Sequence, residues 1–234
     1  MPPSDQLTAD NGQPSLKDIF QWEVRSWSRA LPLWEKHISA DRPLKALGIG
    51  EREGGLSLWL ASKGIDVVCT DLRPLPETTA QLHQRYGVSD RITYAQADAT
   101  SLQFPERSFD IVFFKSVIGA LGSKDAQMQA INEIYRVLKP GGKLLFAENL
   151  HGSPLHGWLR KRYVAWNEYW RYLDPIDDRD LFDRFSKLDD GTTGFIANLG
   201  RSEAQRDLLA RIDALLKPLV PQRQRTIWFG VAEK

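Results

Sequence analysis

The stretch KALGIGEREGG, residues 45–55, joins a short apolar run to a cluster of glycines and is followed at once by the apolar segment LSLWLAS. This order predicts a strand over Ala46–Ile49, a tight loop, and a helix near Leu56–Ser62. Glycines in such a loop let backbone N–H groups approach a ligand beside the N-terminus of the helix. Taken alone, the stretch fits a plain strand-to-helix turn equally well, so its meaning depends on the rest of the chain.

The same alternation of apolar runs and amphipathic segments continues after this stretch. Lys139-Pro140-Gly141-Gly142 ends a helix and turns into a strand, because proline cannot continue a helix and glycine frees the backbone. The pattern predicts an α/β fold with a doubly wound, Rossmann-like, mostly parallel sheet, helices on both faces, and a C-terminal antiparallel strand. The further expected strands are Asp66–Thr70, Ile92–Ala95, Ile111–Phe114, Lys143–Ala147 and Thr226–Ala232, and the further expected helices are Thr78–Tyr86, Gln127–Leu138, 155–172 and Ser202–Leu216.

The chain has 234 residues, which fits one domain of generous size. Residues 1–14 are polar and rich in proline and glycine, so we expect a disordered arm followed by a single domain over 15–234. Helical spacing begins at Ser15 and continues until Pro32 interrupts it, and a second short helix carries Trp34. Residues 174–190 are rich in aspartate and predict no regular element.

An acid follows the second expected strand. Asp71 comes 21 residues after Gly50 and directly precedes Leu72. A carboxylate at this place can accept hydrogen bonds from both hydroxyls of a ribose, whereas alone it would more often be a loop or capping residue. Nicotinamide enzymes and methyltransferases share this arrangement. Reading G-x-G-x-x-G from Gly48 puts Glu53 at the third glycine, which disfavours a nicotinamide dinucleotide.

Three further motifs follow in order: ADAT at 97–100, SFDIVFF at 108–114, and YRVLKPGGKLL at 135–145. With them, residues 44–150 resemble the class I S-adenosylmethionine-dependent methyltransferases. The resemblance implies S-adenosylmethionine as the cofactor and passes particular roles to residues of this chain. The implied cofactor-binding residues are Gly50 and Gly54 for the methionine part, Asp71 with Leu72 for the ribose, Asp98 with Ala99 for the adenine, and in addition Gly48, Glu51 and Lys115.

The glycine loop departs from the family pattern at two positions. Counted back from the helix, the usual acid falls on Gly48 and the middle glycine falls on Arg52. Either Glu51 or Glu53 is a candidate replacement for the acid, and Arg52 is a candidate partner of the cofactor carboxylate. The resemblance also divides the domain into an N-terminal helical lid (15–41), the cofactor-binding core (44–150), and an acceptor-side segment with closing strands (151–234).

Residues that face the methyl acceptor should follow the fourth and fifth strands. Glu148 and His151 are the candidate catalytic bases there, with turn capping and solvation as their ordinary alternatives. Residues 156–172 combine aromatic side chains with a basic cluster, and they either pack on the sheet or bind a flat, anionic acceptor. The candidate substrate-binding residues are Arg160, Arg162 and Trp166.

Composition excludes several other classes. The net charge of +1 argues against a nucleic-acid binder, and Phe114-Lys115-Ser116 lacks the motif of enzymes that methylate adenine in DNA, so we expect no DNA partner. The single cysteine, Cys69, fits neither a disulfide scaffold nor a zinc site, and we expect no metal. The sequence predicts no membrane span and no signal peptide, and hence a cytoplasmic protein.

The expected function is therefore S-adenosylmethionine-dependent methylation of a small-molecule or carrier-linked acceptor. Residues 18–23 and 194–206 resemble methyltransferases associated with surface-polysaccharide biosynthesis, which favours a glycan or nucleotide-sugar hydroxyl. A lipid, quinone or other small-molecule acceptor is the alternative among enzymes. A non-catalytic, S-adenosylmethionine-binding regulatory protein is the alternative outside them.

Overall fold

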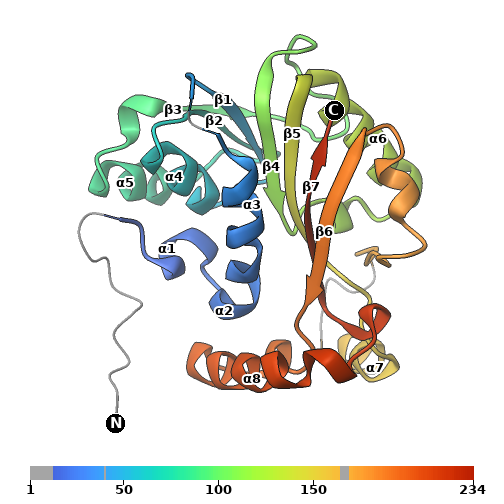
Figure 1. Ribbon diagram of the computed structural model, residues 1–234. Coiled ribbons are helices and arrows are strands. Elements are labelled where there is room, and N and C mark those ends of the chain that lie inside the picture. Colours follow the sequence, from blue (N-terminus) through green and yellow to red (C-terminus); the bar gives the residue numbers. More distant parts are fainter. Residues whose placement is uncertain (1–12, 40, 164–168) are drawn as a thin grey trace.

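A seven-stranded sheet forms the centre of the molecule in the computed structural model, which describes residues 13–39, 41–163 and 169–234. The strand order is β3-β2-β1-β4-β5-β7-β6 (Figure 1). Strands β1 to β5 pair in parallel, and β7 pairs antiparallel with both β5 and β6. The strands are β1 (Lys45–Ile49), β2 (Asp66–Asp71), β3 (Ile92–Gln96), β4 (Phe109–Lys115), β5 (Leu138–Asn149), β6 (Lys187–Thr193) and β7 (Ile227–Glu233).

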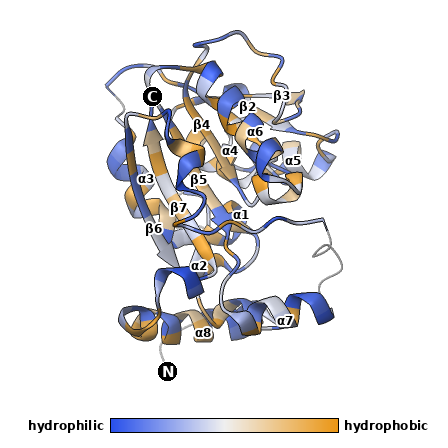
Figure 2. Cartoon of the chain, turned by 90° about the vertical axis from the view of Figure 1, so that its right-hand side faces the viewer, coloured by the Kyte–Doolittle hydropathy of each residue, from blue (hydrophilic) through white to orange (hydrophobic). Residues whose placement is uncertain are grey.

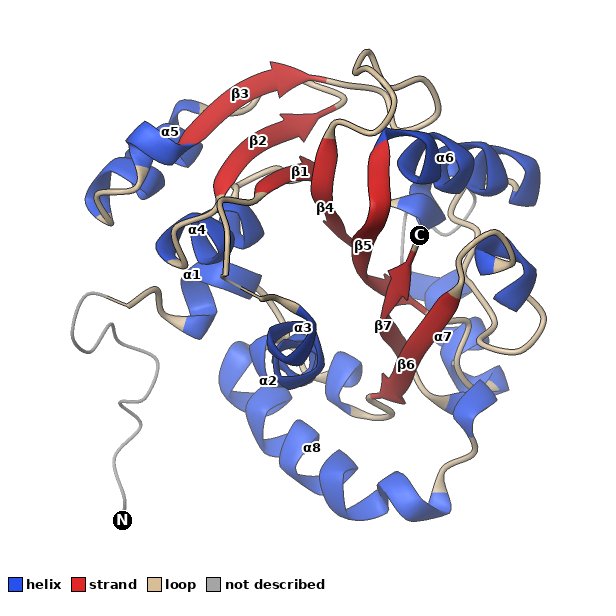
Figure 3. Ribbon diagram, turned by 45° about the horizontal axis from the view of Figure 1, so that its top comes forward, coloured by secondary structure: helices blue, strands red, loops and turns tan. Residues whose placement is uncertain are grey.

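Helices cover both faces of the sheet (Figure 3). Helices α3 (Leu31–His37), α4 (Gly55–Ser62) and α5 (Glu77–Arg85) lie on one side, and α6 (Lys124–Val137) lies on the other. Each face has its own apolar cluster, one built around Trp34 and Trp59 and the other around Ile131 and Ile134. The doubly wound, Rossmann-like fold with its C-terminal antiparallel strand is confirmed, and the apolar colouring of the central strands follows from burial on both faces (Figure 2).

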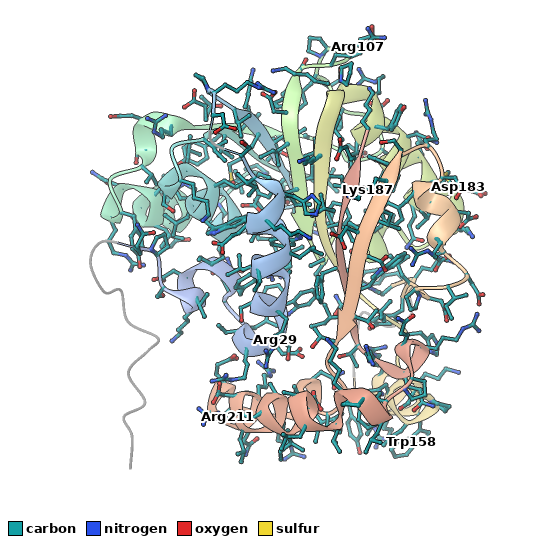
Figure 4. All side chains as sticks on the ribbon, in the orientation of Figure 1. Arg29, Arg107, Trp158, Asp183, Lys187 and Arg211 are labelled. Atoms are coloured by element: carbon teal, nitrogen blue, oxygen red, sulfur yellow. The ribbon has the colours of Figure 1, made fainter. Side chains whose placement is uncertain are left out.

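The carboxyl ends of the parallel strands all meet at one edge of the sheet. Arg107 lies two residues before β4 and marks the opposite, amino edge (Figure 4). Trp158 and Arg211 lie at the far end, on α7 (Pro154–Tyr163) and α8 (Glu203–Leu216). The short helices α1 (Leu16–Phe20) and α2 (Val24–Trp27) complete this end. Segments from both ends of the sequence are thus gathered where the parallel strands finish.

The N-terminal helices differ from the sequence expectation. The helix that begins after Ser15 stops at Phe20, because Gln21 and Glu23 take positive φ angles of 67° and 47°. Pro32 does not interrupt a helix; it lies in the first turn of α3, where a missing N–H is not needed. The segment expected to form a helical lid is therefore a chain of short helices.

Two expectations in the C-terminal half also need correction. Strand β6 was not expected, because KLDDGTT is poor in apolar residues and is held as an edge strand by its pairing with β7. The helix expected over 155–172 ends at Tyr163 in the described part, and residues 164–168 lie outside the described residues. The expected disordered arm lies outside them too, except for residues 13 and 14.

None of the helices in the described ranges is both long enough and apolar enough to cross a bilayer.

Candidate functional site

A cavity of about 890 Å³ lies at the carboxyl edge of the parallel strands. Its described lining comes from the loops after β1 to β5, from the N-terminal helices, and from the C-terminal third of the chain. The lining includes most of the expected cofactor-binding residues, namely Gly50, Glu51, Asp71, Leu72, Asp98, Ala99 and Lys115. Gly48 and Gly54, which were also expected to bind the cofactor, are not among the lining residues.

The loop between β1 and α4 has an alternating backbone pattern. Gly50, Arg52 and Gly54 have φ angles of 64°, 48° and 74°, all in the left-handed region. Arg52 stands where the family resemblance places its middle glycine, and it adopts the conformation that a glycine adopts freely. A side chain at Gly54 would also meet the His83 ring at 2.7 Å. The loop therefore keeps the glycine-type backbone although one glycine is replaced.

Glu51 fills the space beside Gly48. A Cβ atom at position 48 would lie 2.8 Å from Glu51 Cγ and 2.6 Å from the ring of Phe113, so position 48 has no room for an acid. The Glu51 carboxylate instead accepts the backbone N–H of Ser57 at 2.7 Å and caps the start of α4. Burial raises the pKa of Glu51 to about 7.

Asp71 ends β2 and Asp98 comes two residues after β3, on the same side of the cavity. Asp71 accepts the backbone N–H of Arg52 at 3.0 Å and that of Arg73 at 3.1 Å. Asp98 accepts both the N–H and the hydroxyl of Thr100, at 2.8 and 2.7 Å. These bonds hold both carboxylates in place and leave lone pairs for a ligand.

Lys115, the last residue of β4, has an unusual environment. Its side chain is buried, and its Nζ atom has no hydrogen-bond partner among the described residues. The Nζ atom lies 3.1 Å from the ring centroid of Trp22 and 5.1 Å from that of Trp27. Burial lowers the pKa of Lys115 to about 7, against the opposing attraction of Glu51.

The described lining from Lys115 onward has no carboxylate but has three basic side chains, those of Lys115, Arg160 and Arg206. The Arg160 guanidinium donates to the carbonyls of Leu150 and His151 at 3.0 and 2.6 Å, and it stacks on the Tyr172 ring at 3.9 Å. This side of the cavity, which we call the basic half, suits an anionic ligand. Its other described lining residues are Ser116, Val117, Ala120, Leu121, Asn149, Tyr169, Trp170, Tyr172 and Asn198.

Neither candidate base reaches the cavity. Glu148 is fully buried, and its carboxylate accepts the N–H groups of Val117 and Asn149 at 2.8 Å each and that of Gly119 at 3.4 Å. Burial raises the pKa of Glu148. His151 is exposed and does not line the cavity. The geometry gives Glu148 a structural task, which is to hold the loop that follows β4.

Among the described residues, the structure places only one of the expected substrate-binding residues in the cavity lining. Arg160 lines the cavity, whereas Arg162 is exposed beside Tyr163 and does not line it. Trp166 lies outside the described residues. The aromatic residues of the expected lid also differ in where they lie. Trp22 lines the cavity together with its neighbours Ile19 and Gln21, whereas Phe20, Trp27 and Trp34 are buried in the core.

Sequence reasoning missed Arg206 and Asn198 as lining residues, whereas Asn149 was expected among the acceptor-side groups. Asn149 directly follows the expected base Glu148 and donates to Ser116 Oγ at 2.6 Å. Arg206 lies on α8, which contacts the N-terminal helices through Glu203, whose carboxylate accepts the N–H groups of Glu23 and Val24 at 3.0 and 2.8 Å. No local sequence pattern indicates such a contact. The described residues also hold no group of three or more His, Cys, Asp or Glu side chains placed to bind a metal.

Comparisons with known proteins agree with this geometry. Residues 47–146 match the family described as "Methyltransferase domain". The ubiquinone/menaquinone biosynthesis C-methyltransferase UbiE of Shewanella sp. (strain ANA-3) is 33% identical over 156 residues, which cover 63% of this chain and 58% of that protein. The chain thus spans a little more than half the length of this curated relative.

Solved structures show the same fold. Phosphoethanolamine N-methyltransferase 2 of Haemonchus contortus, in complex with S-adenosyl-L-methionine, has a TM-score of 0.65 at 22% identity. The match covers 96% of this chain and 58% of that enzyme's chain. The PH0226 protein of Pyrococcus horikoshii has a TM-score of 0.59 at 20% identity, and the match covers 92% of this chain and 93% of that protein.

The residues present fit the expected cofactor. Asp71 offers a carboxylate for a ribose diol, Asp98 offers an acceptor for an amino group, and the bent loop from Gly50 to Gly54 leaves backbone groups open to a ligand. Residues 47–146 are therefore similar to a methyltransferase domain, and the lining of the cavity fits S-adenosylmethionine.

Proposed function

We propose that the chain is an active S-adenosylmethionine-dependent methyltransferase whose acceptor is a small or carrier-linked molecule with an anionic group. The observation that carries this proposal is the division of charge in the cavity. The described lining carboxylates, Glu51, Asp71 and Asp98, come from the ends of β1, β2 and β3, where Arg52 and Arg73 also line the cavity, whereas the basic half has no carboxylate. One half suits a nucleoside, and the other suits a phosphate or carboxylate.

Bound S-adenosylmethionine supplies a methyl group on a positively charged sulfur. The chain's own residues have to align the acceptor and exclude water. Trp22 and the other lid residues of the lining lie where they can cover the cavity, while Arg160 and Arg206 can orient the anionic group. The Arg160 guanidinium is already held by two carbonyls and by Tyr172, so little side-chain freedom is lost when a ligand binds.

Our first candidate for the acceptor is the hydroxyl of a nucleotide sugar or of another phosphorylated glycan. Its phosphate would use the guanidinium groups, and its sugar would lie against aromatic rings such as those of Tyr169, Trp170 and Tyr172. Our second candidate is a quinone precursor, favoured by the printed name of the UbiE relative. An uncharged quinone ring would leave the arginines of the basic half without a ligand partner.

Release of S-adenosylhomocysteine across a panel of acceptors tests the proposal. The panel contains nucleotide sugars, the same sugars without phosphate, and quinols. Turnover confined to phosphorylated or carboxylated acceptors supports the proposal, and turnover on neutral quinols would replace the first candidate by the second. Binding of S-adenosylmethionine without turnover on any member would favour the regulatory alternative.

A matched pair of variants tests the basic half. Arg206→Gln removes a lining cation and should raise KM for the anionic acceptor about tenfold with little change in kcat, since the contact acts uniformly through the reaction. Arg162→Gln removes a cation that does not line the cavity and should leave KM unchanged. Equal effects of the two substitutions would contradict the proposed role of the basic half.

A further inference from the structure

The Lys115 amine is a buried polar group that stabilises no other described residue through a hydrogen bond. The side chain is 9% exposed, and the Nζ atom makes no hydrogen bond with any described residue. Buried amines in folded proteins are almost always paired, so an unpaired one calls for an explanation. Lys115 also lines the cavity at the carboxyl end of β4. Its missing partner can therefore be a group of a bound ligand.

Several charged and aromatic groups surround this amine. Glu51 follows β1, Glu148 is the last residue but one of β5, and Glu23 precedes α2, and all three favour the ammonium form. Arg52 disfavours that form, and burial disfavours it most, so that the pKa falls to about 7. The ring faces of Trp22 and Trp27 offer partial compensation for a positive charge. Near neutral pH the amine can therefore both lose and take up a proton.

Other candidate proton acceptors near the basic half already have a task or lie elsewhere. Glu148 is buried and bound to backbone N–H groups, and His151 lies outside the lining. Glu51 caps α4 through Ser57. An arginine guanidinium does not give up its proton at neutral pH. Among the described lining residues from Lys115 onward, the lysine amine is the group best suited to accept a proton.

We propose that the Lys115 amine is the catalytic base that takes the proton from the acceptor hydroxyl during methyl transfer. This inference rests on the proposed function. The O–H bond breaks toward Nζ, and its electron pair stays on oxygen while an oxygen lone pair forms the new bond to the methyl carbon. The electron pair of the broken carbon–sulfur bond stays with sulfur. Lys115 becomes an ammonium ion against Trp22 and returns the proton to water before the next turnover.

A binding measurement tests this inference without knowledge of the acceptor. S-adenosylmethionine carries one more positive charge than S-adenosylhomocysteine, and that charge is at the transferring centre. If Lys115 lies at this centre, its charged form weakens binding of S-adenosylmethionine relative to S-adenosylhomocysteine. Calorimetry should then show the relative affinity for S-adenosylmethionine rising about three- to tenfold between pH 6 and pH 8.5, which corresponds to a ligand-induced pKa change of roughly half to one unit.

Three variants separate Lys115 from other groups that titrate in the same range, such as Glu51. Lys115→Met should abolish this pH dependence, and Lys115→Arg should hold the relative affinity at its low-pH value throughout. Lys63→Met is the control, because Lys63 also lies near a tryptophan, 5.3 Å from the Trp59 centroid, but pairs with Glu35 away from the cavity. It should behave like the wild-type protein.

Nuclear magnetic resonance of protein labelled with ¹³C at lysine Cε gives a second, direct readout. One lysine signal, missing in Lys115→Arg, should titrate near pH 7. A Lys115 signal that stays in the ammonium form above pH 9, or a wild-type affinity ratio that does not change with pH, would overturn the inference while leaving the proposed function intact. Failure of both ligands to bind would instead overturn the proposed function, and the inference with it.

Discussion

The backbone N–H of Arg52 donates a hydrogen bond to Asp71 Oδ2 at 3.0 Å, across 19 residues of sequence. This bond joins the loop after β1 to the acid at the end of β2, and it requires the left-handed backbone of Arg52. The carboxylate that we assign to the ribose is thus oriented by the same loop that replaces a family glycine with arginine. A change in the loop at Arg52 should therefore also affect the position of the Asp71 carboxylate.

The strain at Arg52 can be measured with two substitutions that both remove the side chain. Arg52→Gly should be more stable than Arg52→Ala by about 1 kcal/mol, because alanine keeps the cost of a left-handed conformation and glycine does not. Urea denaturation of the two variants gives the difference in the free energy of unfolding. An Arg52→Ala protein as stable as Arg52→Gly would show that the loop is not held in this conformation.

Glu148 should behave as a structural acid. In Glu148→Gln a single amide oxygen remains for the N–H groups of Val117, Gly119 and Asn149, and the new NH₂ group faces donors. We expect a loss of about 1–3 kcal/mol in the free energy of unfolding, together with weaker cofactor binding. Thermal denaturation and calorimetry check both effects. Wild-type stability and cofactor affinity combined with a collapsed rate would restore Glu148 as the base.

Glu23 should make stability depend on pH. Burial raises its pKa from 4.5 to about 7, so the folded state holds a proton that the unfolded state has lost between these values. Its stabilising contribution is complete below pH 4.5 and is lost as the pH rises to about 7. At 1.4 kcal/mol for each pKa unit, the loss in the free energy of unfolding is at most about 3.5 kcal/mol.

The substitution Glu23→Gln removes this titration. Relative to the wild-type protein, the variant should gain stability between pH 4.5 and pH 8 in denaturant titrations. Glu35→Gln is the control, because Glu35 is an exposed residue paired with Lys63 and should show no comparable gain. A Glu23→Gln protein whose stability stays parallel to that of the wild-type protein at every pH would contradict the assignment.

Sequence alone predicted the fold because strands and helices of the core have strong local patterns. The strand β1 and the glycines at 50 and 54 depend on residues close to them in the sequence. The turn expected at 139–142 is instead an irregular first part of β5, which begins at Leu138. The strand β6 could not be predicted in this way, because its stability comes from pairing with β7 rather than from apolar residues of its own.

The cofactor side of the site was more predictable than the acceptor side for the same reason. Asp71 and Asp98 line the cavity because Asp71 ends β2 and Asp98 comes two residues after β3. Arg206 lies on α8, which meets the start of α2 through long-range contacts such as that of Glu203. Glu148 turns inward and accepts three backbone N–H groups. The position of a residue along a strand predicts which edge of the sheet it lies at. It does not predict which side chain turns inward to accept hydrogen bonds from backbone N–H groups.

The central claim is that this cavity binds S-adenosylmethionine with Asp71 at the ribose, and calorimetry of Asp71→Ala tests it most directly. The account predicts that the wild-type protein binds S-adenosylmethionine more tightly than it binds NAD, and that Asp71→Ala loses about 1–3 kcal/mol of binding free energy through missing and unpaired hydrogen bonds. Unchanged S-adenosylmethionine affinity in Asp71→Ala, or tighter binding of NAD by the wild-type protein, would contradict it.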